Sequence, residues 1–580
     1  MSNSLFRRKN ISSIMAEGGD DSHGAGGLKR VLNVKDLTFF GIAAILGAGS
    51  FSSLGGAVFN GGPGVVVLFV ITAIACAFTA FCYSEFASRI PVAGSAYTYA
   101  YASFGELFAW IIGWALIMEY SIGNIYVAYS WSDYFTSFLD KINVHIPQYL
   151  STSYMEAKHA VEDGSTNADV LAAWNNAPMV GGLRIIADIP AFIINVLITM
   201  LVYRGVKESR NFSNLMVVLK LIVVFLVIAV GAYYIFSNGL TANWMPANDE
   251  GVKAFMPNGF GGVMMAVSGV FFAYIGFDAV SVLAEESKNP QRDLPRGMIL
   301  SLVICTIIYI LLTLVLTGAV HYKKFDGVGD PLSFIFEASN LNVGWMQFLV
   351  SIVAVVAMTS VLLVFQMGQP RIWMSMSRDG LLPNVFQKIH PKFKTPSFST
   401  IITGLVVGIP IFFTDKTFVL DFTSIATLFA FVLVCGGVLL IPRVQKEEGK
   451  FNLPYVNSQF IFPAIVLLAI VVLSAFTSSY FTNLFNFDFS ANADYTSGKK
   501  TFMDMALPNI SLIIFWLSLI VMSLFAFLKK WSLIPLMGVA TCLYLLTGMS
   551  KSNWIWFIGW LGLGLVVYFL YGYKKSKLAS

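Results

Sequence analysis

The chain has 580 residues, of which 57% are hydrophobic and only 12% are charged, with a formal net charge of +5. Soluble domains carry about 25% charged residues, so this composition excludes a soluble globular protein and indicates a polytopic membrane protein. The basic excess does not indicate a nucleic-acid partner, because the Lys and Arg residues lie in short connections between apolar stretches.

The first residues are polar and contain no motif of a known enzyme class. Residues 1–36 lack an apolar segment of signal-peptide length, so we expect a cytoplasmic tail. Neither H-E-x-x-H nor G-x-x-x-x-G-K occurs, which argues against a zinc protease and an ATP-driven pump. All five cysteines fall in apolar stretches, where core packing is a better explanation than disulfides or metal ligands. We therefore expect no metal, no other cofactor and no enzymatic activity.

The first apolar stretch has an unusual centre. Residues 41–56 read GIAAILGAGSFSSLGG, and each Gly destabilises a helix by about 1 kcal/mol relative to Ala. In lipid, a broken backbone must find partners inside the protein or line a water-filled cavity. We expect a break near residues 47–51, whose two helix ends can bind the carboxylate and the ammonium of a zwitterion. Close helix packing through small residues is the alternative explanation.

At about 20 apolar residues per membrane helix, we expect about 14 membrane-spanning helices. They are expected near residues 37–60, 64–88, 105–137, 184–203, 213–237, 259–284, 297–320, 343–368, 397–414, 418–441, 459–480, 508–528, 531–548 and 553–573. Lys and Arg concentrate in alternate connections, which predicts that both termini are cytoplasmic. The long connection 138–183 is then external, and it contains no motif that indicates a role.

The sixth expected span repeats the anomaly of the first. It includes the sequence FFAYIGFDAV, with Gly276 and Asp278 near its centre. Two interrupted spans that lie five apart predict two five-helix repeats, residues 37–237 and 259–441, of opposite topology because five is odd. Inverted repeats with broken first helices are a transporter architecture, with the substrate bound between the breaks.

The fold class predicted from these patterns is an all-α polytopic membrane protein with a five-plus-five inverted-repeat core at residues 37–441. Residues 442–573 are expected to add four transmembrane helices, as a structural or oligomer-forming addition. Residues 574–580 are expected to form a second cytoplasmic tail.

Four stretches carry a family resemblance. They are GIAAILGAGSF in span one, FFAYIGFDAVSVLAEESKNPQRDLPRGMILSL from span six into span seven, QMGQPRIWMSMSRDGLLP after span eight and WIWFIGWLGLGLVVYFLYG at the last span. With these motifs the chain, from about residue 36 to 573, resembles the cationic amino acid transporter family of the amino acid–polyamine–organocation superfamily. Bacterial members of that family resemble carriers of neutral as well as cationic amino acids.

The resemblance implies a carrier that works by alternating access. The implied substrate-binding residues are Ile45, Gly47, Ala48, Gly49, Phe272, Ala273, Ile275 and Met358. The backbone of residues 47–49 would face the substrate carboxylate, the carbonyls of the other broken-helix residues would face its ammonium, and the Phe272 ring would form a lid. Met358 would face the substrate side chain, and because it offers no carboxylate it favours a neutral amino acid. Ordinary packing is the alternative for Met358.

The chain departs from the family pattern at three positions. Ser50 stands where Ile or Val is usual, and Asn124 and Tyr126 stand where small apolar residues are usual. These changes bear on the identity of the substrate and on the size of the pocket.

Three ionisable residues lie within apolar spans: Glu119, Lys220 and Asp278. A charge at the bilayer centre costs roughly 2.5–3.5 kcal/mol, so each requires a partner, water or a role. By resemblance, Lys220 occupies the place that a Na⁺ ion takes in sodium-coupled relatives, which makes it a proton carrier or a fixed structural brace. Asp278 either couples protons or caps the second half of span six, and Glu119 either couples protons or makes a structural hydrogen bond.

These features predict a secondary carrier of amino acids, either proton-coupled or an exchanger, and independent of sodium. The expected partners are an amino acid, protons and the lipid bilayer, and the expected location is a bacterial inner membrane. An exchanger of amines or polyamines, and a membrane sensor that binds amino acids without transport, are the alternatives. Charged residues at the cytoplasmic ends of the spans, among them Lys207, Arg292 and Asp379, either form an inner gate of ion pairs or are solvated loop ends.

Overall fold

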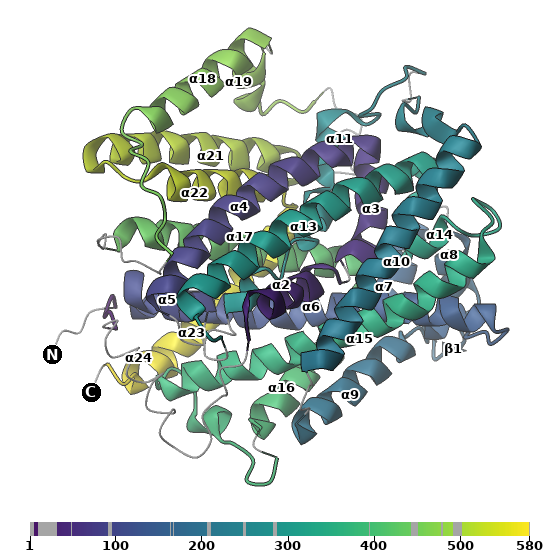
Figure 1. Ribbon diagram of the computed structural model, residues 1–580, viewed down its shortest axis with the longest axis horizontal. Coiled ribbons are helices and arrows are strands. Elements are labelled where there is room, and N and C mark those ends of the chain that lie inside the picture. The colour runs from purple at the N-terminus through teal and green to yellow at the C-terminus, as the bar shows by residue number, and fades with distance from the viewer. Residues whose placement is uncertain are drawn as a thin grey trace.

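The computed structural model describes residues 5–9, 32–47, 49–90, 95–162, 164–165, 167–205, 210–247, 251–281, 287–393, 395–441, 451–476, 479–490 and 501–578. Figure 1 shows long helices stacked side by side and running in related directions. In these described ranges, eight helical segments are long and apolar enough to cross a membrane, and four shorter apolar helices accompany them. The prediction of a polytopic helical membrane protein is therefore confirmed.

The first predicted span is an interrupted helix. Helix α2 (Val34–Ile45) begins at a capping box, in which Asn33 accepts hydrogen bonds from backbone N–H groups and Asp36 bonds back to Asn33. The helix ends at Ile45, and the chain resumes with a π-helical turn, η1 (Gly49–Ser53), and helix α3 (Leu54–Gly61). The interruption thus lies within the glycine-rich centre of the stretch.

The sixth predicted span is also interrupted. Helices α11 (Gly259–Met265) and α12 (Val267–Phe272) are separated by Ala266, and regular helix ends at Phe272. Gly276 then adopts a φ of +117°, which disfavours a side chain. The chain therefore turns sharply in this stretch instead of continuing as a straight helix.

The other core helices are continuous and surround these two segments. They are α4 (Val65–Arg89), α6 (Glu106–Lys141), α9 (Ile189–Arg204), α10 (Arg210–Ser237), α13 (Pro290–Ala319), α15 (Gly344–Arg378), α16 (Ser397–Gly408) and α17 (Lys416–Leu440). A short helix, α5 (Ser95–Ser103), lies between α4 and α6. One large hydrophobic cluster unites these elements. All five cysteines are buried in it as free thiols, four from the core helices and Cys542 from a later helix.

The long connection after α6 has a fold of its own. It contains helices α7 (Tyr154–Glu162) and α8 (Ala168–Asn175) and an antiparallel hairpin of β1 (Met179–Val180) and β2 (Leu183–Arg184). A small separate core of Ala157, Ala173, Ala177 and Ile186 holds it together. Further along the chain, helix α14 (Pro331–Phe334) precedes α15 at the same end of the molecule (Figure 1).

The later helices divide into two groups. Helices α18 (Ile461–Phe476), α19 (Tyr480–Leu484) and α21 (Phe502–Lys529) form a second hydrophobic cluster with one face of α22 (Leu533–Leu546). The opposite face of α22, and α23 (Lys551–Val567), belong to the main core. The additional helices are therefore not a separate unit, since two of them complete the core.

Helix α23 is fastened to α6 by a reciprocal pair of tryptophans. The Trp114 indole N–H donates to the Trp560 carbonyl at 2.9 Å, and the Trp560 indole N–H donates to the Trp114 carbonyl at 3.0 Å. The two rings are stacked with centroids 4.8 Å apart. Because both indoles are satisfied without water, this contact suits an interface in lipid.

Both ends of the chain meet at one end of the molecule (Figure 1). Asp379, just after α15, pairs with the Lys9 ammonium at 2.9 Å and accepts a hydrogen bond from the Tyr97 hydroxyl at 2.6 Å. Its carbonyl accepts a hydrogen bond from the Lys577 backbone N–H at 3.1 Å. Residues 5–9, expected to belong to a tail, are therefore packed against the core.

Candidate functional site

The two interrupted helices touch each other at their breaks. A Cβ atom on Gly49 would lie 2.5 Å from the Ala273 Cα, and a Cβ on Gly276 would lie 2.9 Å from the Ala44 Cβ. Such distances are far inside van der Waals contact, so both positions need Gly for the helices to approach. The sequence signal of repeated glycine in both spans thus has a direct structural cause.

Tyr309 of α13 binds both breaks. Its buried hydroxyl lies 2.8 Å from the Ile45 carbonyl and 2.7 Å from the Ala273 carbonyl. These carbonyls lie where the regular helix ends on either side, and the Ile45 carbonyl also accepts from the Gly47 N–H at 2.9 Å. The phenol of Tyr309 thus joins the two carbonyl oxygens that are expected to face a substrate ammonium. The sequence patterns did not indicate this role for Tyr309.

Serine hydroxyls satisfy further backbone groups in the same region. The Ser53 hydroxyl lies within hydrogen-bond distance of two carbonyls, that of Gly49 at 2.7 Å and that of Gly269 at 2.9 Å. The Tyr134 hydroxyl of α6 donates to the Phe51 carbonyl at 2.5 Å. Side chains from several helices therefore replace the hydrogen bonds that the π-helical turn and the break remove.

The predicted substrate-binding residues have different environments. Phe272, Ala273 and Ile275 are buried beside the first break, and Gly47 lies against Val361 of α15, which a Gly47 Cβ would meet at 2.7 Å. Met358 is fully buried on α15, three residues before Val361. Ala48 lies outside the described residues. The roles of all eight residues in binding stay predictions.

The three departures from the family pattern also have clear environments. The Ser50 hydroxyl donates to the Gly47 carbonyl at 3.0 Å, so it helps to close the turn that an Ile or Val could not. Tyr126 packs edge-on against Phe272, with ring centroids 4.6 Å apart, and its hydroxyl reaches Ser52 at 3.3 Å. Asn124 is fully buried, and neither of its amide atoms has a hydrogen-bond partner within the described part of the chain.

Lys220 of α10 connects the first broken helix to α15. Its ammonium is buried, with 1% of the residue exposed, and donates to the Ser360 hydroxyl at 3.0 Å. The Ala43 carbonyl, two residues before the end of α2, lies 3.4 Å away. The Lys220 side chain therefore joins α2 to α15, and its role as a proton carrier or as a brace in place of a sodium ion stays a prediction.

Glu119 and Asp278 lie close enough to interact electrostatically, and both are at most 5% exposed. Glu119 bonds with Thr427 of α17, and Asp278 bonds with backbone N–H groups of its own turn at Gly276 and Ala279. Glu119 thus has a hydroxyl partner, and Asp278 has partners within its own turn; the structural and the proton-coupling roles of both residues stay predictions. The two roles are compatible, because a carboxylate can titrate while it is hydrogen-bonded.

A cavity of about 1990 Å³ leads from the first break toward the end of the molecule opposite the termini. Ser52, Ser53 and Tyr126 line its inner part, and residues of α7 and of the loops before α14 and α17 line its outer part. The cavity is lined by α6 from Tyr126 back to Met118, and it opens toward the end of the molecule where α7 and the loop before α14 lie. On the predicted topology this is the external side.

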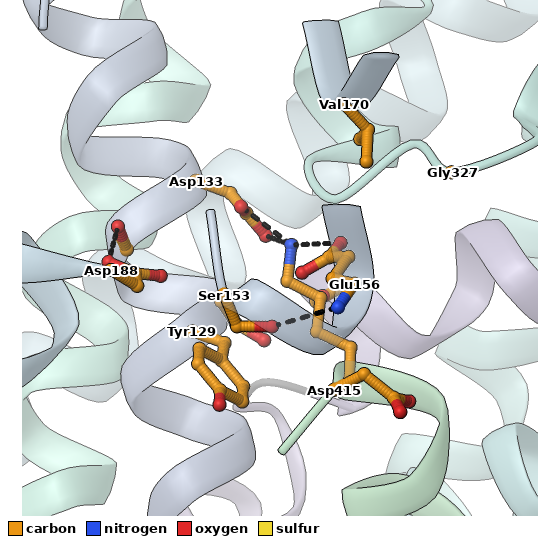
Figure 2. Close-up of polar contacts among 12 residues, drawn as sticks. Tyr129, Asp133, Ser153, Glu156, Val170, Asp188, Gly327 and Asp415 are labelled. Carbon is orange, nitrogen blue, oxygen red and sulfur yellow. Dashed lines mark hydrogen bonds and ion pairs between the residues drawn. The ribbon is translucent and has the colours of Figure 1, made fainter. Parts of the chain in front are cut away.

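Charged residues surround the outer part of the cavity (Figure 2). The Lys416 ammonium lies between Asp133 of α6, at 2.6 Å, and Glu156 of α7, at 3.5 Å. On α7, His159 lies 3.3 Å from Asp415, which also caps α17. These pairs fix the folded connection between α6 and α9 to the helices that form the cavity wall.

The expected inner gate is described only in part. Lys207, Glu285 and Glu286 lie outside the described residues, and Asp379 pairs with Lys9 of the N-terminal segment. Arg292 lies 3.9 Å from the neighbouring Asp293 and is half exposed. The described residues therefore assign Asp379 to a contact with the chain ends.

Comparison with known proteins identifies the family. A model of the amino acid permease family matches residues 32–487, and a model of the C-terminus of such permeases matches residues 533–576. The chain belongs to the amino acid permease family. The two family models together cover both interrupted helices and the last helices of the chain.

Relatives of this permease are named as transporters. It is 36% identical to the branched-chain amino acid permease BcaP of Bacillus subtilis over 578 residues, which is 100% of each chain. It is 33% identical to the methylthioribose transporter of the same organism, over 99% of each chain. It is 35% identical to the vacuolar cationic amino acid transporter 2 of Arabidopsis thaliana over 77% of this chain and 64% of that one. The permease is an integral multi-pass membrane protein of an amino acid transport family.

Gly49→Ala should abolish amino acid uptake by this permease and lower its thermal stability. The added methyl group would lie 2.5 Å from the Ala273 Cα and force the two breaks apart. Gly56→Ala is the matched control, because its Cβ would meet nothing within 4 Å. Uptake in proteoliposomes and melting in detergent would test this, and wild-type uptake by Gly49→Ala would contradict the packing of the breaks.

Tyr309→Phe should reduce uptake at least about tenfold, since leaving a buried carbonyl without its partner costs about 1–3 kcal/mol. Tyr129→Phe is the control: it removes a buried hydroxyl of α6 that donates to the Ile411 carbonyl just after α16, outside both breaks. Equal rates for the two variants in the same uptake assay would show that the Tyr309 hydroxyl is not required.

Proposed function

We propose that this permease is a secondary carrier of amino acids that favours neutral substrates, is independent of sodium, and works by proton-coupled symport or by exchange. Its transport core is formed by residues 37–441 as two inverted repeats of five helices, 37–237 and 259–441, within about 14 transmembrane helices. Both termini are cytoplasmic, and the membrane is a bacterial inner membrane. The similarity to two full-length Bacillus subtilis transporters supports this location.

The observation that carries the proposal is the position of Lys220. Its ammonium reaches both the end of α2 and Ser360 of α15. A sodium ion at the same place would put two positive charges together in a buried site, which is unfavourable. A carrier with this arrangement has no need of sodium to hold the first broken helix against α15.

The substrate is proposed to lie where the breaks meet, between the backbone at residues 47–49 and the Ala273 turn. The carboxylate is oriented by N–H groups and the ammonium by carbonyls, of which those of Ile45 and Ala273 would have to leave Tyr309. Met358 supplies an apolar end to the pocket, which favours a neutral side chain. The name of the branched-chain amino acid permease agrees with this preference.

The name of the methylthioribose transporter points to a different substrate class at similar overall identity. Methylthioribose has neither an ammonium nor a carboxylate group, so it cannot use the helix ends in the way proposed for an amino acid. Substrate class must therefore be tested directly. The pairing of the helix ends and the apolar Met358 favour the amino acid.

The deciding experiment is uptake of labelled Ala, Leu, Arg and methylthioribose into proteoliposomes that contain the purified permease. Each is measured with and without an inward proton gradient, and with Na⁺ replaced by K⁺ on both sides. We expect sodium-independent uptake of Leu or Ala, driven by the proton gradient or by internal amino acid. Strict dependence on Na⁺ would overturn the account of Lys220, and uptake of methylthioribose alone would overturn the substrate class.

Lys220→Arg should keep exchange of internal for external substrate but lose proton-driven accumulation, because a guanidinium holds its proton at every working pH. Lys220→Met should reduce both processes at least about tenfold, because it leaves the Ala43 carbonyl and Ser360 without the ammonium. Lys551→Arg, which alters a partly exposed ammonium paired with Asp504, is the control. Full proton-driven accumulation by Lys220→Arg would show that Lys220 is a brace and not a proton carrier.

A further inference from the structure

One wall of the outer cavity is formed by α17 and α23, and it contains a carboxylate, Asp421. The Asp421 side chain accepts a hydrogen bond at 2.7 Å from the Asn553 amide nitrogen of α23, and the Ser268 hydroxyl also bonds with it. The charged residue that interacts electrostatically with Asp421 is another acid, Asp415. Within the described part of the chain, Asp421 therefore has neutral donors but no cation to balance its charge.

Asn553 adds an unused acceptor beside this carboxylate. Only 1% of the residue is exposed, and its amide nitrogen donates both to Asp421 and, at 2.6 Å, to the Ser550 hydroxyl. The nitrogen must point toward Asp421, because a carboxylate can only accept. The amide oxygen Oδ1 is buried without a hydrogen-bond partner among the described residues.

Aromatic rings cover the same wall. Phe418 lies one turn from Asp421 on α17 and Phe422 follows Asp421 directly, whereas Trp556 and Trp560 lie one and two turns from Asn553 on α23. The rings of Phe418 and Phe422 are 5.4 Å apart, and those of Phe418 and Trp556 are 5.9 Å apart. A carboxylate, an amide oxygen without a partner and several aromatic faces are the acceptors and π surfaces that recognise an ammonium group.

We propose that this wall is a second binding site, which takes the α-ammonium of the amino acid before it enters the central site. An ammonium group here would balance the charge of Asp421, donate to Asn553 Oδ1 and lie against the aromatic rings. The inference rests on the proposed amino acid transport for the identity of its ligand. It also assigns α23 a role in substrate capture in addition to its place in the core.

Asp421→Asn is the test, with Asp326→Asn as the matched control. Asp326 is a carboxylate in the same cavity, but it lies on the loop before α14 and not on this wall. Under the proposal, Asp421→Asn raises the KM for Leu uptake about tenfold and leaves the maximal rate within about twofold. Asp326→Asn leaves both values unchanged. Equal rises in KM for the two variants would indicate that the negative charge of the whole cavity attracts the substrate, and would overturn the proposal.

A second readout does not require transport. Tetramethylammonium carries the same charge as the α-ammonium group, but it has no carboxylate for the central site to bind. It is titrated against wild-type permease in detergent while tryptophan fluorescence is followed. Sodium chloride at equal ionic strength is the blank. We expect a saturable change in wild type and in Asp326→Asn that is lost in Asp421→Asn. A wild-type permease that transports no amino acid but still gives this change would refute the proposed function and keep the ammonium site.

A second variant guards against a folding defect in Asp421→Asn. Trp556 is 59% exposed, so Trp556→Leu removes an aromatic face without opening a hole in the core. It should raise the KM for Leu and weaken inhibition of uptake by tetramethylammonium, with melting unchanged. Unchanged KM and unchanged inhibition in both Asp421→Asn and Trp556→Leu would overturn the site.

Discussion

Peptide groups at the helix breaks must have hydrogen-bond partners inside the protein, and much of the core depends on this requirement. Water in the bilayer cannot supply those partners, and each group left unpaired costs several kcal/mol. Tyr309 from α13, Tyr134 from α6 and Ser53 from the π-helical turn meet the requirement from different directions. Continuous helices are therefore arranged around two discontinuous ones, and the place where hydrogen bonds are exchanged most easily is also the place proposed for the substrate.

The charges within the core follow the same logic. Lys220 is paired with a hydroxyl and a helix-end carbonyl, and the external acids Asp133 and Glu156 share Lys416. Asp421 differs, because its hydrogen-bond donors, the Asn553 amide and the Ser268 hydroxyl, are neutral. A carrier must keep some of its polar groups incompletely satisfied so that a ligand can satisfy them, and the contrast between these residues separates structural ion pairs from candidate ligand contacts.

Local sequence patterns predicted the breaks, because glycine and serine act on the helix in which they occur. The partners of those breaks lay beyond such reasoning: Tyr309 is 264 residues from Ile45, and a tyrosine in an apolar span has no pattern that marks it. The external connection was also missed as a folded unit, since its core consists mainly of alanines, which give a weak hydrophobic signal. The additional helices are predicted from sequence as a structural or oligomer-forming addition, and the faces of α22 and α23 that enter the main core could be assigned only once their neighbours were known.

The meeting of both chain ends at Asp379 has a mechanical consequence. A force applied between the two termini would first load the contacts of Lys9 and Lys577 with that residue and not a transmembrane helix. Once these contacts gave way, traction on the C-terminal end would reach the tryptophan pair that fastens α23 to α6, whereas traction on the N-terminal end would reach the broken helix α2. The protein would thus be extracted from a bilayer along two different routes, with the more firmly fastened helix at the C-terminal end.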